Sequence, residues 1–137
     1  MKTDFEKLGF RIGEIWHFSP REALEAARNG AIFVDVRQKY ESGFKAFDVE
    51  NIIYMDHTEI EKRYQELPGK MFLIIADSVG LHSKEVVSFL QTKGFNQLAN
   101  LNGGICDWER DGLPMIMDVN QRLSGACACM LKPRENN

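Results

Sequence analysis

The 137-residue chain lacks any long hydrophobic run. Its longest apolar stretch is the six residues Met71–Ala76, far short of the roughly 20 that a membrane-spanning helix needs. It also lacks an excess of positive charge, because the formal net charge is −3, so we expect neither nucleic acid nor an anionic membrane as a partner. Residues 1–7 carry several charges and no apolar segment follows them, unlike a secretory signal. We therefore expect a cytoplasmic protein.

Cysteine is scarce as well. The chain has three cysteines, an odd number that does not suggest a disulfide framework in a chain of this length. Cys106 follows a Gly-Gly pair, whereas Cys127 and Cys129 are separated by one residue near the C-terminus. The composition, with 44% apolar and 27% charged residues, is typical of one globular domain that buries a core.

Short apolar segments alternate with amphipathic ones along the chain. Strands are expected at 14–18, 31–36, 51–55, 71–76 and 96–101, and helices at 19–28, 56–67, 83–93 and 106–111. The first two helices begin with capping-box patterns, Ser19 with Glu22 and Asp56 with Glu59. This alternation predicts an α/β fold with a mainly parallel sheet of about five strands and helices on both faces. Residues 37–50 are polar and irregular.

The segment 71–83 is the most informative one. A buried apolar strand ends in a short polar turn, and a helical pattern begins at once. In such a turn the backbone N–H groups and the helix N-terminus converge on one point that favours negative charge. We therefore expect the functional site at this turn, which begins with the carboxylate Asp77.

Several motifs together resemble rhodanese-homology domains over roughly residues 14–116. They are Asp35-Val36-Arg37, the strand–loop–helix at 71–93, Gly94-Phe95, and the run Leu-x-Gly-Gly-x-x-x-Trp-x-x-x-Gly-x-Pro from Leu101 to Pro114, which contains Gly103, Gly104 and Trp108. Glycines there allow a sharp turn, and the tryptophan anchors the short helix. The resemblance implies a three-layer rhodanese/Cdc25-like fold.

The resemblance also implies a chemistry that this sequence does not support. In active family members the six-residue loop begins with a cysteine, whose thiolate takes sulfur from thiosulfate or a persulfide. The matching loop here is Asp77, Ser78, Val79, Gly80, Leu81 and His82, followed by Ser83. A carboxylate cannot carry sulfane sulfur, and the arginines that often line the loop are missing. We therefore do not expect a standard thiosulfate sulfurtransferase or a Cdc25-like phosphatase.

Two interpretations of Asp77 remain open. It accepts hydrogen bonds from the loop amides and stabilises the turn as an internal anion, or it acts with His82 as a base or metal ligand. We favour the first. Both interpretations predict weak affinity for thiosulfate or phosphate.

The cysteines are the second candidate for chemistry. Cys127 and Cys129 can carry a persulfide, bind a soft metal with further ligands, or have no role. Cys106 lies at the start of a short helix, where a thiol can be reactive, although a packing role is the favoured interpretation. His17 and His57 are expected to be solvated or locally bonded.

The sequence thus predicts an N-terminal extension at 1–13, a rhodanese-like domain at 14–117 and a tail at 118–137. The leading hypothesis is a non-catalytic binding, regulatory or sulfur-relay module without a cofactor. The alternatives are a sulfurtransferase that uses the tail cysteines, and a tail that binds a soft metal. We expect a protein or sulfur-donor partner, and a monomer or weak homodimer.

Overall fold

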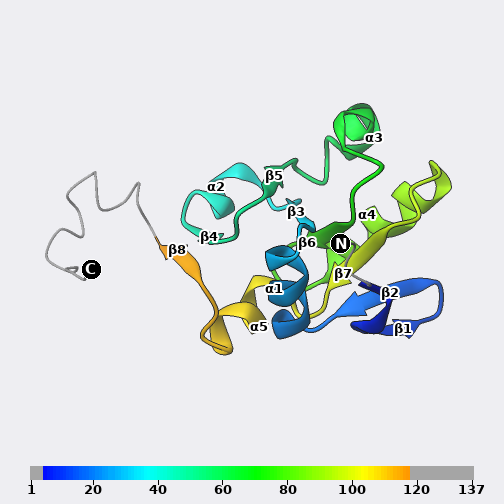
Figure 1. Cartoon of the computed structure of the whole chain (residues 1–137). Coiled ribbons are helices and arrows are strands. Elements are labelled where there is room, and N and C mark those ends of the chain that lie inside the picture. The colour runs from blue at the N-terminus through cyan, green and yellow to red at the C-terminus, as the bar shows by residue number, and fades with distance from the viewer. Residues whose placement is uncertain (1–4, 118–137) are drawn as a thin grey trace, which may run out of the picture.

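The computed structural model describes residues 5–117 (Figure 1). Its elements are η1 Phe5–Lys7, β1 Phe10–Ile12, β2 Ile15–Phe18, α1 Pro20–Arg28, β3 Ile32–Asp35, α2 Lys39–Ser42, β4 Lys45–Phe47, β5 Ile52–Tyr54, α3 Ile60–Arg63, η2 Tyr64–Glu66, β6 Leu73–Ala76, α4 Leu81–Thr92, β7 Leu98–Leu101, α5 Gly104–Arg110 and β8 Met115–Met117. The tail with Cys127 and Cys129 lies outside the described residues.

The main sheet has six strands in the order β1-β2-β7-β6-β3-β5. The pairs from β2 to β5 are all parallel, and only β1 is antiparallel to its neighbour. The predicted α/β fold with a mainly parallel sheet of about five strands is confirmed, and the observed sheet has six. Strand β1 lies within residues 1–13, where an N-terminal extension is predicted, and its three residues are all exposed. They therefore show no burial pattern from which a strand could be predicted.

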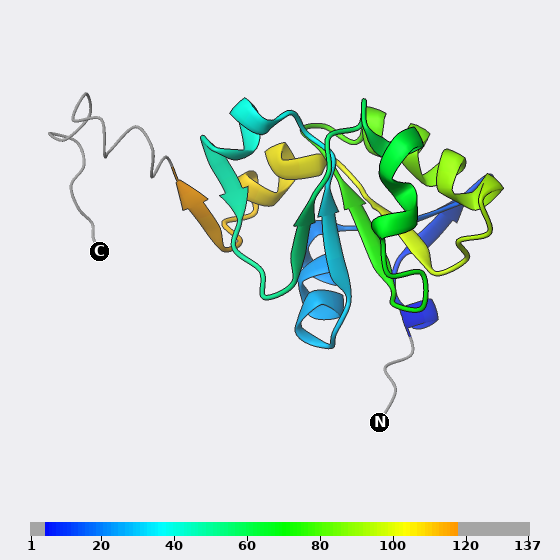
Figure 2. The same cartoon turned by 90° about the horizontal axis from the view of Figure 1, so that it is seen from above.

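Helices cover both faces of this sheet (Figures 1 and 2). On one face α1 and α5 pack on a core that includes Phe18, Phe33 and Trp108. On the other face α3 and α4 pack on a second core that includes Val34, Ile75 and Leu90. Strand β6 is fully buried along its length, as expected for a central parallel strand with helices on both sides.

Of the two capping boxes predicted from the sequence, the structure confirms the first and not the second. Ser19 accepts a hydrogen bond from the Glu22 N–H, and the Glu22 carboxylate accepts one from the Ser19 N–H, which is the predicted capping box. Helix α3, however, begins only at Ile60. Asp56 instead accepts hydrogen bonds from the Thr58 N–H and hydroxyl at 2.9 and 3.1 Å, a local turn that competes with helix initiation.

The segment 37–50 is more ordered than its composition suggests. It forms α2 and then β4, which pairs antiparallel with β8 in a small second sheet. Trp108 is fully buried under this region, makes edge contacts with Phe33 and Phe47, and donates its indole N–H to the Pro114 carbonyl at 2.8 Å. The tryptophan thus anchors α5 to the core, as predicted.

Within the described range, no helix combines the length and apolar character required to cross a membrane. The cytoplasmic location and the oligomeric state remain predictions from the sequence.

Candidate functional site

The site lies at the carboxyl ends of three parallel strands, where open α/β sheets usually bind ligands. Strand β6 leads into the loop that begins at Asp77, while β3 leads to Arg37 and β5 leads to His57. Gly80 ends the turn as the residue before α4, with a left-handed φ of 96°. An L-residue with a side chain rarely adopts that conformation.

Helix α5 supports the loop from below. The Ile105 and Cys106 N–H groups donate to the carbonyls of Asp77 and Ser78 at 2.9 and 3.1 Å. A Cβ on Gly104 would lie 2.4 Å from the Ser78 carbonyl carbon and oxygen, so only glycine permits this approach. The Gly-Gly motif and the loop are therefore one packing unit.

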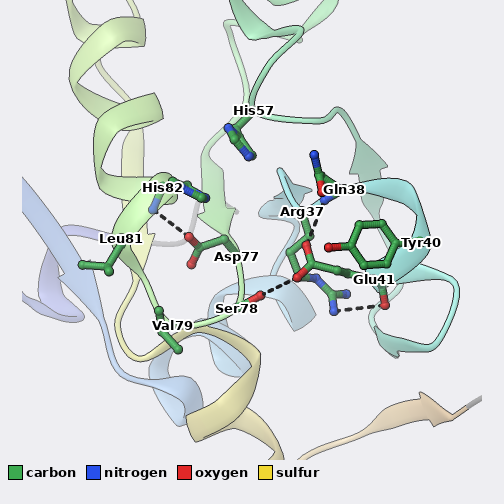
Figure 3. Close-up of a pocket in the computed structure, with 10 residues that line it drawn as sticks. All are labelled: Arg37, Gln38, Tyr40, Glu41, His57, Asp77, Ser78, Val79, Leu81 and His82. Atoms are coloured by element: carbon green, nitrogen blue, oxygen red, sulfur yellow. Dashed lines mark hydrogen bonds between the residues drawn. The ribbon is translucent and has the colours of Figure 1, made fainter.

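The Asp77 carboxylate is buried, with 3% of the residue exposed, and it faces the loop amides (Figure 3). Oδ1 accepts hydrogen bonds from the Gly80 N–H and from the Ser83 hydroxyl. Oδ2 accepts hydrogen bonds from the His82 N–H at 2.7 Å and the Ser83 N–H at 3.2 Å. These are the hydrogen bonds predicted for a loop that holds its own anion.

A buried polar chain continues from the loop into the sheet. The Ser83 Oγ lies 2.5 Å from Asn100 Oδ1 on β7, and Asn100 Nδ2 lies 3.2 Å from His17 Nδ1 on β2. Both Asn100 and His17 are at most 3% exposed. Burial lowers the pKa of His17, and the charge of Lys84 lowers it further.

This hydrogen-bonded series from Ser83 through Asn100 to His17 was not predicted from the sequence. His17 was expected to be solvated or locally bonded, and that was wrong, because parallel pairing with β7 places it opposite Asn100. Asn100 is a polar residue inside a fully buried strand. That pattern is the signal from which a buried hydrogen-bond network could have been inferred.

Arg37 and Asp35 form a buried ion pair beside the loop. The guanidinium Nη2 and Nε lie 2.8 and 3.1 Å from the two carboxylate oxygens. Its remaining donors reach the carbonyls of Lys45 and Glu41 at 2.8 and 3.4 Å. Arg37 therefore holds α2 and β4 against the end of β3, and each of its three guanidinium nitrogens has at least one acceptor.

These elements enclose a hollow of about 390 Å³. It is lined by Arg37, Gln38, Tyr40, Glu41, His57, Asp77, Ser78, Val79, Leu81 and His82 (Figure 3). The Ser78 hydroxyl donates to Glu41 Oε2 at 3.4 Å, which links the loop to α2. The loop residues Gly80 and Ser83 lie behind this surface and are buried.

The imidazole of His82 stacks on that of His57, with ring centroids 4.1 Å apart. It is the backbone N–H of His82, and not its ring, that is hydrogen-bonded to Asp77. Within residues 5–117 no three His, Cys, Asp or Glu side chains are grouped so that they could hold a metal ion. The Asp77 carboxylate is thus hydrogen-bonded to the loop backbone and to Ser83, whereas the His82 ring is stacked on His57.

Cys106 is exposed on the surface of α5, so the expected packing role was wrong. The buried positions of this short helix are taken by Gly104, Ile105 and Trp108, and the helical period turns Cys106 outward.

Comparisons with known proteins agree with this geometry. A family model described as "Rhodanese-like domain" matches residues 19–111. The thiosulfate sulfurtransferase GlpE of Actinobacillus pleuropneumoniae serotype 7 (strain AP76) is 30% identical over 98 residues, which cover 71% of this chain and 89% of that protein. GlpE of Haemophilus influenzae (strain PittEE) is 26% identical over 101 residues, covering 71% of this chain and 90% of that protein.

Solved structures show the same fold. A rhodanese-related protein from Thermoplasma volcanium superposes with a TM-score of 0.66 at 22% identity, covering 74% of this chain and 98% of that protein. At this identity the likeness concerns the fold alone. Together with the sequence matches and the loop at the end of β6, it leads to one conclusion: this chain belongs to the rhodanese-like domain family.

Proposed function

We propose that this chain is a rhodanese-like domain that lacks the catalytic cysteine and acts as a non-catalytic binding or regulatory module. The observation that carries the proposal is the Asp77 carboxylate, which occupies the start of the loop and accepts hydrogen bonds from three loop amides. In an active member of the family a thiolate would stand there and would use those amides.

The chemistry of sulfur transfer explains why the substitution matters. A thiolate attacks the outer sulfur of thiosulfate, an S–S bond forms, and sulfite leaves with the electron pair of the broken bond. The persulfide anion is then held by converging N–H groups. A carboxylate oxygen cannot form a stable bond to sulfane sulfur. At Asp77 the same N–H groups already bind the protein's own anion.

A direct test is cyanide-dependent sulfur transfer from thiosulfate by the pure protein. We expect no thiocyanate above the protein-free background from the wild type. The Asp77→Cys variant, whose fold is checked by circular dichroism, supplies the missing nucleophile. After incubation with thiosulfate its loop peptide should gain the mass of one sulfur atom. Wild-type turnover comparable to that of an active rhodanese would overturn the proposal.

A second candidate is a sulfurtransferase in which Cys127 or Cys129 carries the persulfide. Its support is the position of β8, the last described strand before the tail. Met117 pairs with Lys45 in the small sheet, and the Lys45 carbonyl accepts a hydrogen bond from Arg37, which lines the hollow. This candidate requires the ten residues 118–127, whose extended length is at most roughly 33 Å, to bridge Met117 and the hollow.

Mass spectrometry separates this candidate from the first. After incubation with thiosulfate, a tail peptide heavier by one sulfur atom in the wild type, and unchanged in a Cys127→Ser, Cys129→Ser double variant, would establish the relay. Metal analysis of anaerobically purified protein tests the soft-metal alternative, because a persulfide carrier should be purified without a metal.

A further inference from the structure

The hollow in front of the loop has an unusual charge balance. Its lining contains two carboxylates, Asp77 and Glu41, and one arginine, Arg37. The Arg37 guanidinium is paired with the buried Asp35. Within residues 5–117 neither carboxylate of the lining forms an ion pair with a Lys, Arg or His side chain. The net charge offered to a ligand is therefore negative.

Glu41 is the carboxylate that a ligand can reach. Asp77 is buried and both of its oxygens accept hydrogen bonds from the loop. Glu41 is half-buried on α2, with Oε1 accepting the Gln38 N–H at 3.1 Å and Oε2 accepting the Ser78 hydroxyl at 3.4 Å. Each carboxylate oxygen has room for a further donor, so Glu41 is held in place and can accept more hydrogen bonds.

Exposed apolar and aromatic side chains flank the hollow. Val79 and Leu81 on the loop side are 52% and 61% exposed, and Tyr40 on the α2 side is 74% exposed. Figure 3 shows Tyr40 beside Glu41, with Val79 and Leu81 on the opposite, loop side. A small inorganic ion would leave these side chains uncovered, whereas a polypeptide segment would cover them.

We propose that the hollow binds an arginine side chain of a partner polypeptide, with the guanidinium paired to Glu41 and the neighbouring partner residues packed on Val79, Leu81 and Tyr40. This inference rests on the proposed non-catalytic function and names the partner chemistry of that site. An anion-binding loop that is filled by its own carboxylate repels anions and attracts cations. The site has thus reversed its charge preference.

The geometry favours arginine over lysine. A guanidinium is planar, can donate two hydrogen bonds to one carboxylate, and stacks on aromatic faces. The lining provides both kinds of partner, because Glu41 supplies the carboxylate while Tyr40 and His57 supply ring faces. An ammonium group would use the charge and can lie over a ring face, but it lacks the planar fork that donates two parallel hydrogen bonds to one carboxylate.

The test is a titration of the full chain, followed by backbone amide NMR, with a short capped peptide that carries one arginine between two leucines. Matched peptides carry lysine, glutamate or citrulline, the neutral isostere of arginine, at the central position. We expect shifts at the amides of Ser78, Val79 and Glu41. We also expect citrulline to bind about two- to fivefold more weakly than arginine, the loss produced by removing one partly exposed ion pair.

Variants locate the binding site. Glu41→Gln should weaken arginine-peptide binding about two- to fivefold. Glu25→Gln, which removes an exposed carboxylate of α1 that does not line the hollow, should leave it unchanged. The inference is overturned if the glutamate peptide or inorganic thiosulfate binds the hollow as tightly as the arginine peptide, if Glu41→Gln has no effect, or if no peptide binds. None of these results alters the sulfur-transfer assay, so the two proposals fail separately.

Discussion

Replacing Asp77 with asparagine tests the central feature of the site, a carboxylate bound by its own loop. The two side chains have nearly the same shape, so the change removes one acceptor oxygen and the charge without creating a cavity. Both oxygens of Asp77 accept hydrogen bonds. The amide NH₂ of asparagine must therefore face donors whichever way it is turned.

The hydrogen bonds of Ser83 indicate which orientation of the asparagine amide has the lower free energy. Its N–H and that of His82 both donate to Oδ2, so an NH₂ group there would leave two amides without an acceptor. At the Oδ1 position only the Gly80 N–H loses its acceptor, because the Ser83 hydroxyl still has Asn100 Oδ1 at 2.5 Å. We therefore expect the NH₂ group to take the Oδ1 position.

The expected cost is the sum of two effects. One buried N–H without an acceptor costs about 1–3 kcal/mol. The two remaining hydrogen bonds become neutral ones, which are roughly half as strong as those to a charge. Relief from burying a charge offsets part of this loss. We expect Asp77→Asn to lower the free energy of unfolding by about 2–4 kcal/mol.

Urea unfolding followed by tryptophan fluorescence measures this change, with the m value checked for constancy. Asp56→Asn is a matched control, because within residues 5–117 the hydrogen bonds to the Asp56 carboxylate, both from Thr58, end on Oδ1, and asparagine keeps one oxygen. We expect it to cost less than about 1 kcal/mol. Equal stability of the Asp77→Asn variant and the wild type would refute the inference that hydrogen bonds to the Asp77 carboxylate stabilise the loop.

Two further changes test the support of the loop. Because burial lowers the pKa of His17, the unfolded chain takes up that proton more readily than the folded chain. The His17 contribution to stability is therefore fully present above the ordinary pKa of about 6.5, and it is lost as the pH falls from there toward the lowered pKa. Urea unfolding measured from pH 8 to 5 should show this loss of stability, and the His17→Gln variant should show less of it. The same pH dependence in the variant would exclude His17 as the source. Gly104→Ala should lower the free energy of unfolding by about 1–3 kcal/mol more than Gly30→Ala does. Both glycines have positive φ, but the new Cβ at residue 104 would clash with Ser78, whereas nothing lies within 4 Å of a Cβ on Gly30. Equal losses of stability would show that the loop can move away from the added methyl group.

Strand β1 and helix α3 show where prediction from local sequence patterns fails. A capping box and a buried apolar strand are read from neighbouring residues, so α1 and β6 were predicted within one or two residues of their observed starts. Strand β1 was not, because its exposed residues are ordered by hydrogen bonds to β2. Helix α3 was predicted too long, since the local Asp56 turn competes with its first turn.

At the site, too, local features could be predicted from the sequence and contacts between distant segments could not. The position of the loop and the acid at its start are visible in the sequence, because a strand, a turn and a helix follow one another within 71–93. The hydrogen bonds from the loop amides to Asp77 were also predicted, since all the groups lie within seven residues. The hollow in front of the loop was not, because its other wall comes from residues 37–41 and from His57.

By itself the sequence determined the α/β fold class, which follows from the alternation of strand and helix patterns along the chain. It also determined the place of the loop and the residue at its start, which lie within one strand–loop–helix unit. Only the tertiary structure decided that His17 and Asn100, 83 positions apart, complete a buried chain behind the loop. It alone decided that β3 and β6 lie side by side, which places Glu41 against Ser78 at the hollow. Pairings of this kind depend on which strands become neighbours in the sheet, and local periodicity records burial but not partners.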